Sequence, residues 1–273
     1  MSLINNKYIL NDEIGAGSFG TIYKATNVRT NEKVAIKVEP IKNNTKLLKN
    51  ESVVYQYLSS TLGVPIIKWY GKDEYNYYMV INLLGESLQN IIERKNKIPL
   101  KLTLQIGVQI IYLLRNIHEK GLVHRDIKPD NFLFGLNDKK TQIHIIDFGF
   151  CKSFIKDDKH IPFKKTNNLI GSPTYVSVNA HNFNELSRRD DLESLAYVLM
   201  YLFFGELNWQ KNLENGEIMN NNIIKNMKIN IINDDKIPTI LTEYLKNVRS
   251  LEFEEKPNYA ILADMFKREI YLL

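Results

Sequence analysis

The chain has little of what secreted or membrane proteins require. Its 273 residues include a single cysteine, Cys151, so no internal disulfide can form, and a reducing compartment is the simplest expectation. No apolar run approaches the roughly 18 residues that a membrane span needs, and Met1–Tyr8 lacks the apolar core of a signal peptide. These absences predict a soluble intracellular protein of the cytoplasm or nucleus, with no membrane partner.

The chain also has no large excess of one sign of charge. The 36 basic residues and 31 acidic residues give a net charge of only +5, and their dispersal argues against nucleic acid as the main ligand. An acidic substrate is compatible with this balance. With 44% apolar and 25% charged residues, the composition is that of an ordinary globular chain. Because no internal repeat or linker divides it, we expect a single domain over residues 1–273.

A glycine-rich stretch near the N-terminus is placed to approach a phosphate. Alternating patterns predict strands at Tyr8–Ile14 and Thr21–Thr26, joined by Gly15–Gly20 with the sequence GAGSFG. Backbone N–H groups without neighbouring Cβ atoms can come close to a phosphate, and no helix starts after this loop, as a dinucleotide-binding loop would need. Alone the pattern is weak, and a plain flexible hairpin is the alternative.

A lysine and a glutamate are expected to pair behind this hairpin. The third predicted strand, Lys33–Glu39, carries Lys37, and the predicted helix Thr45–Ser60 carries Glu51 on its apolar stripe. A carboxylate on such a stripe either meets a cation or loses much hydration. The alternative is a glutamate at the edge of the stripe that reaches solvent. We favour the ion pair because the lysine also needs a partner.

The pattern changes from strands to helices near Leu84-Gly85. Later elements are predicted as strands at Ile66–Trp69 and Tyr77–Leu83 and as helices at Glu86–Arg94, Leu192–Phe204, Ile240–Leu251 and Tyr259–Leu272. Another long helix, ending near Gly121, has a stripe expected to face inward: Leu102, Ile106, Ile110, Leu113, Leu114 and Ile117. We therefore expect an N-lobe of about residues 1–83, a hinge at about 82–86 and a C-lobe of about 86–273, with a ligand in the cleft between a sheet lobe and a helical lobe.

Two regions lack a sustained pattern. Residues 150–182 are predicted to form a long surface segment of the kind that is functional or disordered. The Asn-rich residues 211–235 are predicted to be a mobile surface region. Between them, Asp191 is predicted to cap the start of the buried helix Leu192–Phe204.

The most polar motif of the chain is His124–Asn131, HRDIKPDN, which is entered and left through short apolar runs. A fixed order of acid, cations and amide predicts a catalytic loop, with an exposed charged turn as the alternative. A hairpin of Phe132–Phe134 and Gln142–Ile146 follows. It would let Asp126 and Asp147 face one pocket.

These residue types match the needs of phosphoryl transfer, which are alignment and neutralisation of phosphate charge. Lys37 can hold the α and β phosphates, and Asp147 and Asn131 offer oxygen ligands to Mg²⁺. Asp126 can orient a substrate hydroxyl and accept its proton, while Lys128 can offset charge on the transferred group. A bare hydrolytic metal site is the alternative, but it has no need of a glycine-rich hairpin.

Over nearly its whole length the chain resembles eukaryotic-type protein kinases. The shared motifs are GAGSFG, VAIK (Val34–Lys37), Glu51, HRDIKPDN and DFG (Asp147–Gly149). It is more narrowly similar to the casein kinase 1 family in LLGESL (Leu83–Leu88), HIPF (His160–Phe163), SVNAH (Ser177–His181), SRRDDLESLAYVLMY (Ser187–Tyr201) and RSLEFEEKPNY (Arg249–Tyr259). The resemblance implies an α+β bilobal protein-kinase fold. Its small N-lobe would be an antiparallel β-sheet with one main helix, and its larger C-lobe mainly helical.

The resemblance also implies a site for ATP and Mg²⁺. The nucleotide would contact Ile14, Gly15, Ala16, Gly17, Ser18, Phe19, Gly20, Ile22, Ala35, Lys37, Ile81, Asn82, Leu83, Leu84, Leu133, Ile146 and Asp147. Within this set Ile81 would be the gatekeeper, and the backbone of Asn82–Leu84 would bind the adenine. The catalytic group would be Asp126, Lys128, Asn131, Lys37 and Glu51, with the metal on Asn131 and Asp147. Such kinases phosphorylate Ser or Thr near acidic or phosphorylated residues, and we expect a monomer.

The sequence departs from the family at a substrate-binding position. Gly171–Tyr175 is Gly-Ser-Pro-Thr-Tyr, where the family has Gly-Thr-Ala-Arg-Tyr. The family's arginine binds a phosphate or acidic group upstream of the target, and Thr174 cannot carry that charge. An anion pocket could still form from Arg125, Lys152, Lys164 and Lys165. We therefore expect a weaker, not absent, preference for substrates primed by phosphorylation.

Two further departures and two rival functions complete the expectations. Asn82 stands where the family's hinge usually has Glu, so inhibitor fit should differ. The chain stops at Leu273 without the family's regulatory tail, which predicts a constitutively active catalytic unit. A pseudokinase or nucleotide-binding scaffold is the first rival. Loss of Lys37, Asp126, Asn131 or Asp147 would favour it, but all four residues are present. A small-molecule kinase on a related fold is the second.

Overall fold

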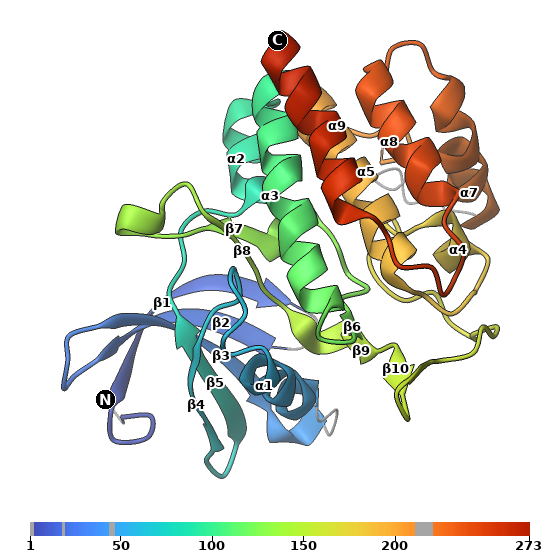
Figure 1. Ribbon diagram of the computed structural model, residues 1–273. Coiled ribbons are helices and arrows are strands. Elements are labelled where there is room, and N and C mark those ends of the chain that lie inside the picture. The colour runs from blue at the N-terminus through green and yellow to red at the C-terminus, as the bar shows by residue number, and fades with distance from the viewer. Residues whose placement is uncertain (1–2, 18–19, 44–46, 211–220) are drawn as a thin grey trace. The chain divides into compact units, whose positions relative to one another are not determined.

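The computed structural model describes residues 3–17, 20–43, 47–210 and 221–273 (Figure 1). The chain divides into two compact units. The first comprises Met1–Gly85 and Leu133–Gly149, and the second comprises Glu86–Phe132 and Phe150–Leu273. Residues 133–149, which the sequence division put with the C-lobe, thus pack with the first unit. Within the described ranges, every helix is too short or too polar to cross a bilayer.

An antiparallel sheet of five strands, in the order β1-β2-β3-β5-β4, forms the body of the first unit (Figure 1). Its strands are β1 (Tyr8–Gly17), β2 (Gly20–Asn27), β3 (Lys33–Pro40), β4 (Ile67–Lys72) and β5 (Asn76–Asn82). Alternation of side chains sends one face of β2, β3 and β5 into a core that contains Ala25, Ile36 and Val80. The predicted strands are therefore confirmed, with ends displaced by a few residues.

One α-helix and a short hairpin complete the first unit. The helix predicted over Thr45–Ser60 is α1 (Leu47–Tyr57), preceded by the 3-10 helix η1 (Ile41–Asn43), and residues 44–46 lie outside the described part. The predicted hairpin pairs β7 (Phe132–Phe134) with β8 (Ile143–Ile145), and its turn holds η3 (Asn137–Lys139).

The second unit is mainly helical. Its α-helices are α2 (Leu88–Lys95), α3 (Leu100–His118), α4 (Val178–His181), α5 (Arg188–Phe204), α7 (Asn221–Asn230), α8 (Thr239–Arg249) and α9 (Tyr259–Leu272). Helix α3 packs against α5 and α9, and α5 packs against α8 (Figure 1). As predicted, α5 is buried along most of its length. The expected α+β class is confirmed by a sheet at the N-terminus followed by a helical region.

The predicted inward stripe of α3 is wrong at one end. Leu102 is 49% exposed, whereas Ile106, Ile110 and Ile117 are buried. Because α3 begins only at Leu100, Leu102 lies in its first turn, where the buried positions are taken by other residues. The stripe starts one turn later than the pattern alone suggested.

The two regions without a sequence pattern contain short elements. Residues 150–182 include β9 (Lys152–Ser153), β10 (Ile155–Lys156) and β11 (Lys159–His160), and β9 pairs with β6 (Leu122–Val123). Within 211–235, residues 211–220 lie outside the described part. The rest forms α7 and the 3-10 helix η5 (Ile231–Asn233), so the prediction of a mobile surface region is wrong for residues 221–233.

The predicted cap of α5 is also corrected. Helix α5 begins at Arg188 with Ser187 as its N-cap residue, and the backbone N–H of Ser187 donates to Asp190 Oδ2 at 2.8 Å. Asp191 lies inside the first turn and accepts backbone N–H groups from elsewhere, at His124 and Arg125. Its carboxylate accepts backbone N–H groups, as predicted, but these groups belong to the motif His124–Asn131 and not to helix α5.

Gly107 lies where α3 packs tightly against α5 and α9. A Cβ atom there would lie 2.8 Å from Phe266 of α9 and 3.0 Å from Leu199 of α5. Alanine would gain about 1 kcal/mol of helix propensity but overpack the site at a cost of about 1–3 kcal/mol. We expect Gly107→Ala to lower the free energy of unfolding by about 1 kcal/mol, measured by urea denaturation. Gln105→Ala, on the exposed face of the same helix, is the control; a stabilised Gly107→Ala would contradict this packing.

Candidate active site

Lys37 and two carboxylates form a buried charge cluster in the first unit. On β3, Lys37 Nζ lies 2.8 Å from Glu51 Oε2 and 3.0 Å from Asp147 Oδ1. The expected ion pair is thus present, with a second carboxylate that the sequence had not paired with the lysine. Burial lowers the pKa of Lys37, but the charges of Glu51 and Asp147 outweigh it and the net pKa is raised. Burial raises the pKa of Glu51 to about 7, against the opposing effect of the lysine. The ammonium group of Lys37 therefore contacts two carboxylates, and these contacts fix the position of the lysine side chain.

The turn at Asp147 is fastened to helix α1. Its backbone N–H donates to Tyr55 Oη at 3.2 Å, and the Phe148 ring meets the Tyr55 ring edge-on with centroids 5.0 Å apart. Asp147 has φ = 65°, a left-handed conformation that is costly for a residue with a Cβ atom. Such strain persists only where surrounding contacts hold it. Tyr55 supplies such contacts.

The two strands on either side of the glycine-rich loop pair as expected. β1 and β2 pair from Tyr8↔Asn27 up to Gly17↔Gly20, while Ser18 and Phe19 lie outside the described residues. Gly20 has φ = 150°, and a Cβ atom there would lie 2.1 Å from the carbonyl oxygen of Val38. Glycine is therefore required at this end of the loop by the neighbouring strand.

The residues expected around the adenine all belong to the first unit, including Leu133 and Ile146. Ala35 on β3 and Ile81 on β5 are directly paired across the sheet. The Asn82 side chain accepts a hydrogen bond from the backbone N–H of Ile66 at 2.9 Å, which ties the end of β5 to the start of β4. The side-chain amide of Asn82 therefore has a structural role.

In the second unit, both carboxylate oxygens of Asp126 are held by donors. Oδ1 accepts from the backbone N–H and the hydroxyl of Ser172, at 3.0 and 2.8 Å. Oδ2 lies 2.8 Å from Lys128 Nζ. The Asn131 amide nitrogen donates to the Asp126 backbone carbonyl at 2.8 Å, which fixes the direction of that side chain. The structure brings the three predicted residues together and adds Ser172, which no spacing rule connects with position 126.

A buried carboxylate beneath the loop orients its backbone. Asp191 accepts from the backbone N–H groups of His124 at 2.7 Å and Arg125 at 2.9 Å. It also lies 3.0 Å from His118 Nε2, and His118 Nδ1 lies 2.7 Å from Tyr259 Oη. Burial would raise the pKa of Asp191, but the hydrogen bond and charge of His118 and the backbone donors outweigh it, and the pKa is lowered. The ionised carboxylate is therefore the stable form.

The predicted anion pocket contains a carboxylate from this chain. Glu185 Oε2 lies 2.7 Å from Lys152 Nζ and 3.8 Å from Lys164 Nζ, and its Oε1 lies 3.9 Å from an Arg125 Nη1. Glu185 is 1% exposed. Arg125 Nε donates to the carbonyl of Phe150 at 2.7 Å. Three of the four predicted cations thus surround Glu185, and the sequence had not singled out this acid.

Lys165, the fourth cation of that prediction, makes different contacts. Its Nζ donates to the carbonyl of Asn182 at 3.0 Å and to Asn184 Oδ1 at 2.8 Å. It therefore fastens the segment before α4 to the one after it.

A family model described as a protein kinase domain matches residues 8–267. The chain belongs to the protein kinase family. The matched range begins at the first residue of β1 and ends within α9. Protein kinases are phosphotransferases that use ATP, usually with Mg²⁺, and act on protein substrates.

Each unit of this kinase has an oxygen-bearing side chain of a type that suits Mg²⁺. In the first unit the carboxylate of Asp147 is 26% exposed. In the second unit the Asn131 amide nitrogen donates to the Asp126 backbone carbonyl, which leaves the amide oxygen as the acceptor. Within the described ranges, His, Cys, Asp and Glu nowhere gather in a group of three able to hold a metal ion. Few protein ligands suit Mg²⁺, which keeps water and binds largely through phosphates.

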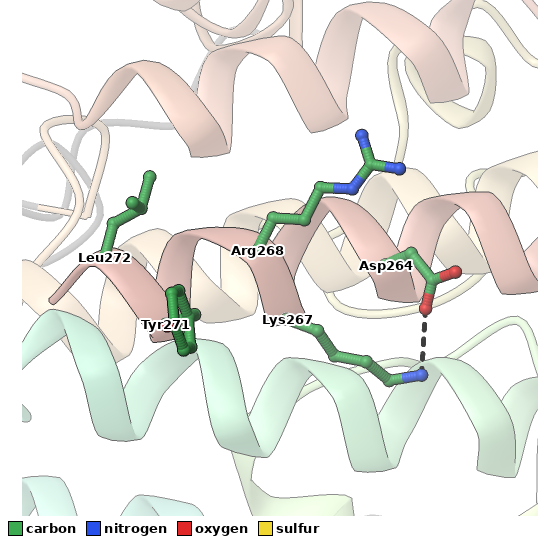
Figure 2. A pocket seen from close by; sticks show the side chains of 5 residues that line it. All are labelled: Asp264, Lys267, Arg268, Tyr271 and Leu272. Atoms are coloured by element: carbon green, nitrogen blue, oxygen red, sulfur yellow. Dashed lines mark hydrogen bonds and ion pairs between the residues drawn. The ribbon is translucent and has the colours of Figure 1, made fainter.

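A separate hollow lies on the surface of α9 in this kinase (Figure 2). It is lined by Asp264, Lys267, Arg268, Tyr271 and Leu272. Lys267 Nζ lies 2.9 Å from Asp264 Oδ1 within it. None of these residues belongs to a motif or to a contact of the catalytic loop, so we assign the hollow no part in the chemistry.

Asp191 predicts a pH dependence of stability. Its pKa is lower in the folded kinase than the roughly 3.9 of an unfolded Asp. Its contribution is therefore fully present above about pH 4 and is lost as the pH falls through the folded value. We expect Asp191→Asn to lower the free energy of unfolding by about 2–3 kcal/mol at pH 7, since charge-assisted hydrogen bonds are lost.

Urea denaturation between pH 7 and pH 3.5 measures this effect. The gap between wild type and Asp191→Asn should be constant down to about pH 5 and narrow below about pH 4. Asp264→Asn, at an exposed carboxylate, should show almost no gap at any pH. A gap that stays constant through pH 3.5 would contradict the role given to the ionised carboxylate.

Proposed function

We propose that this protein is an ATP-dependent Ser/Thr protein kinase of casein kinase 1 type. It would transfer the γ-phosphate of ATP to Ser or Thr hydroxyls near acidic or phosphorylated residues, as a monomer, with a weakened preference for primed sites. The observation that carries the proposal is the fixed Asp126 carboxylate, held by Ser172 on one oxygen and by Lys128 on the other. An acid oriented in this way suits a base for an incoming hydroxyl.

Each residue of the second unit has a defined task in this proposal. Asp126 receives the proton of the substrate hydroxyl, whose oxygen bonds to the γ-phosphorus of ATP as the bond from that phosphorus to the β–γ bridging oxygen breaks and ADP leaves. Lys128, 2.8 Å from Asp126, supplies positive charge beside the transferred group. Ser172 occupies the carboxylate oxygen Oδ1 and limits the directions from which a hydroxyl can approach.

The first unit would bind the nucleotide. Lys37, kept charged by Glu51 and Asp147, binds the α and β phosphates, and the backbone N–H groups of Gly15–Gly20 cover the phosphate chain. The apolar residues expected around the adenine, with Ile81 as gatekeeper, exclude water from the base. Mg²⁺, when bound, neutralises phosphate charge, and Asp147 and Asn131 are the protein groups that we propose hold it.

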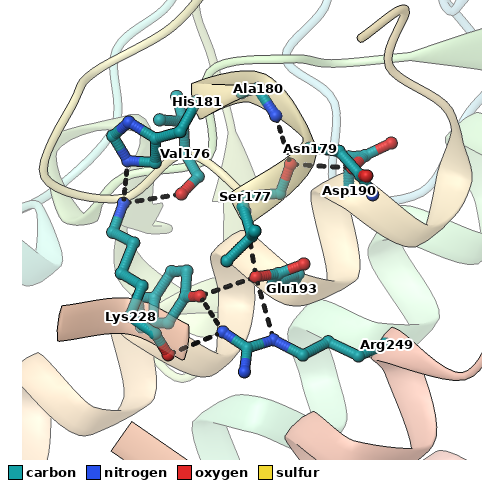
Figure 3. Close-up of polar contacts among 11 residues, drawn as sticks. Val176, Ser177, Asn179, Ala180, His181, Asp190, Glu193, Lys228 and Arg249 are labelled. Carbon is teal, nitrogen blue, oxygen red and sulfur yellow. Dashed lines mark hydrogen bonds and ion pairs between the residues drawn. The ribbon is translucent and has the colours of Figure 1, made fainter. Parts of the chain in front are cut away.

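The casein kinase 1 type is supported by the segments that carry the narrower resemblance. Ser177 Oγ and Asn179 Nδ2 donate to Asp190 Oδ1 at 2.7 and 3.0 Å (Figure 3). The SVNAH segment and the SRRDD segment are therefore direct partners. These hydrogen bonds between the two motifs fix the start of α4 on α5.

The first test is transfer itself. Incubation with γ-labelled ATP, Mg²⁺ and casein should label the casein, and Asp126→Asn should lower the rate roughly 10²–10⁴-fold because the proton acceptor is lost. Asp138→Asn, at an exposed acid, is the matched control and should retain wild-type rate. Absence of transfer by the wild type would defeat the proposal in favour of a nucleotide-binding scaffold. Equal transfer by Asp126→Asn would defeat the role of that residue.

The weakened preference for primed substrates has two structural supports. Thr174, at the position where the family has Arg, is half-buried and carries no charge, and Glu185 partly neutralises Arg125 and Lys152. An added phosphate therefore meets less positive charge than these cations would offer without Glu185.

Matched peptides, with and without a phosphoserine three residues before the acceptor, test this proposal. The wild type should show a small ratio of kcat/KM between them. Thr174→Arg should raise the ratio roughly fivefold, as expected from an exposed ion pair of about 1 kcal/mol. Thr174→Gln, of similar length without charge, should leave the ratio unchanged. A strong primed preference in the wild type would refute the proposal.

A further inference from the structure

Lys228 on α7 is a fully buried lysine that the proposed chemistry does not use. It has 0% exposure. Its Nζ donates to the carbonyl of Pro173 at 2.9 Å. It also donates to the carbonyl of Val176 at 2.6 Å and lies 3.1 Å from His181 Nε2 (Figure 3). Burial of a lysine is costly unless its donors are all satisfied. A methionine would fill the same space more cheaply if packing were the only need.

The hydrogen-bond pattern assigns three donors to Lys228. Asn221 donates its amide N–H to the His181 carbonyl at 2.8 Å, so its Oδ1 accepts from His181 Nδ1, 2.5 Å away. Burial and the nearby lysine charge lower the pKa of His181 to about 4, which keeps the ring neutral. Its Nε2 is then an acceptor. Three acceptors match the three N–H bonds of an ammonium group, whereas a neutral amine has only two.

Two aromatic rings and an ion pair lie next to the lysine. Lys228 Nζ lies 4.8 Å from the ring centroid of Tyr197 and 5.5 Å from that of Trp209. Arg249 Nη2 donates to the Lys228 carbonyl at 2.8 Å, and Arg249 Nε lies 3.2 Å from Glu193 Oε1. Burial lowers the pKa of Lys228 well below its usual value; the charge of Glu193 opposes that change and the charge of Arg249 adds to it. The lysine is thus part of a closed network that joins α7, α5 and α8.

The carbonyls that Lys228 binds belong to the segment beside the candidate base. Ser172, which holds Asp126 Oδ1, directly precedes Pro173. Trp209 Nε1 donates to the carbonyl of Thr174 at 2.8 Å. Buried donors therefore hold the carbonyls of residues 173, 174 and 176, while Thr174 itself is half-buried. A substrate hydroxyl directed to Asp126 would pass along this segment.

We propose that Lys228 is a positioning residue for the protein substrate, which holds the segment Pro173–Val176 at the depth where Ser172 meets Asp126. The inference rests on the proposed kinase activity. It assigns Lys228 no contact with ATP or the reacting atoms. Its loss should therefore affect the protein substrate and leave nucleotide binding unchanged.

Kinetics with Lys228→Met distinguish positioning from a general loss of structure. This variant keeps the apolar stem and removes all three donors. We expect kcat/KM for a peptide substrate to fall at least about tenfold, because a displaced segment misaligns the acceptor, while KM for ATP changes less than twofold. Lys225→Met, three residues earlier on α7, is the matched control and should behave as wild type. An unchanged peptide kcat/KM, or an equal change in KM for ATP, would overturn the inference.

Hydrogen exchange tests the same idea without activity. In Lys228→Met, the backbone amides of Ser172 and of residues 174–178 should exchange at least about tenfold faster, while those of α3 stay protected. Unchanged exchange in this segment, or an equal increase throughout the second unit, would overturn the inference. If Lys228→Met gives no folded protein, Lys228→Gln, with two donors, takes its place under the same criteria. A wild type that labels no protein would defeat the proposed function, and the exchange result would still decide the role of Lys228.

Discussion

The loop His124–Asn131, which we propose is the catalytic loop, depends on one buried carboxylate, Asp191. Backbone amides cannot be left unpaired in a protein interior, and the amides of His124 and Arg125 lie in a loop with no strand or helix to pair them. Asp191 accepts both, and the left-handed conformation of Arg125, with φ = 68°, is held in place by these contacts. The geometry of Asp126 follows directly, because it is the next residue in the chain.

Each unit uses the polar side chains of one helix to orient functional segments. In the second unit, Asp190, Asp191 and Glu193, all in the first two turns of α5, bind three different segments: the start of α4, the catalytic loop, and Arg249 of α8. In the first unit, Glu51 and Tyr55 of α1 hold Lys37 and the turn at Asp147. Buried charges and hydroxyls on rigid helices give better-defined positions than loop contacts would, because helix backbones move little.

Several parts of the site were accessible from sequence because their signals are local. The strands, the ion pair of Lys37 with Glu51, and the association of Asp126 with Lys128 and Asn131 follow from alternation, from an acid on an apolar stripe, and from close spacing. Ser172 and Glu185 were missed as partners, since each meets its charged neighbours only after a long segment without periodicity has folded. Lys228 was missed for a similar reason: its region is rich in Asn and polar, and nothing in that pattern marks a residue as buried.

The sequence by itself determined which chemical groups this kinase has and in what order, because motifs and periodicities are properties of neighbouring residues. Only the tertiary structure decided which partner each buried group receives. Burial compels every charge and amide to find a partner, but the choice depends on which segments pack together. Asp191 therefore serves the catalytic loop and not its own helix, and Lys228 serves a segment more than 50 residues away, with its Nζ 2.9 Å from the Pro173 carbonyl oxygen.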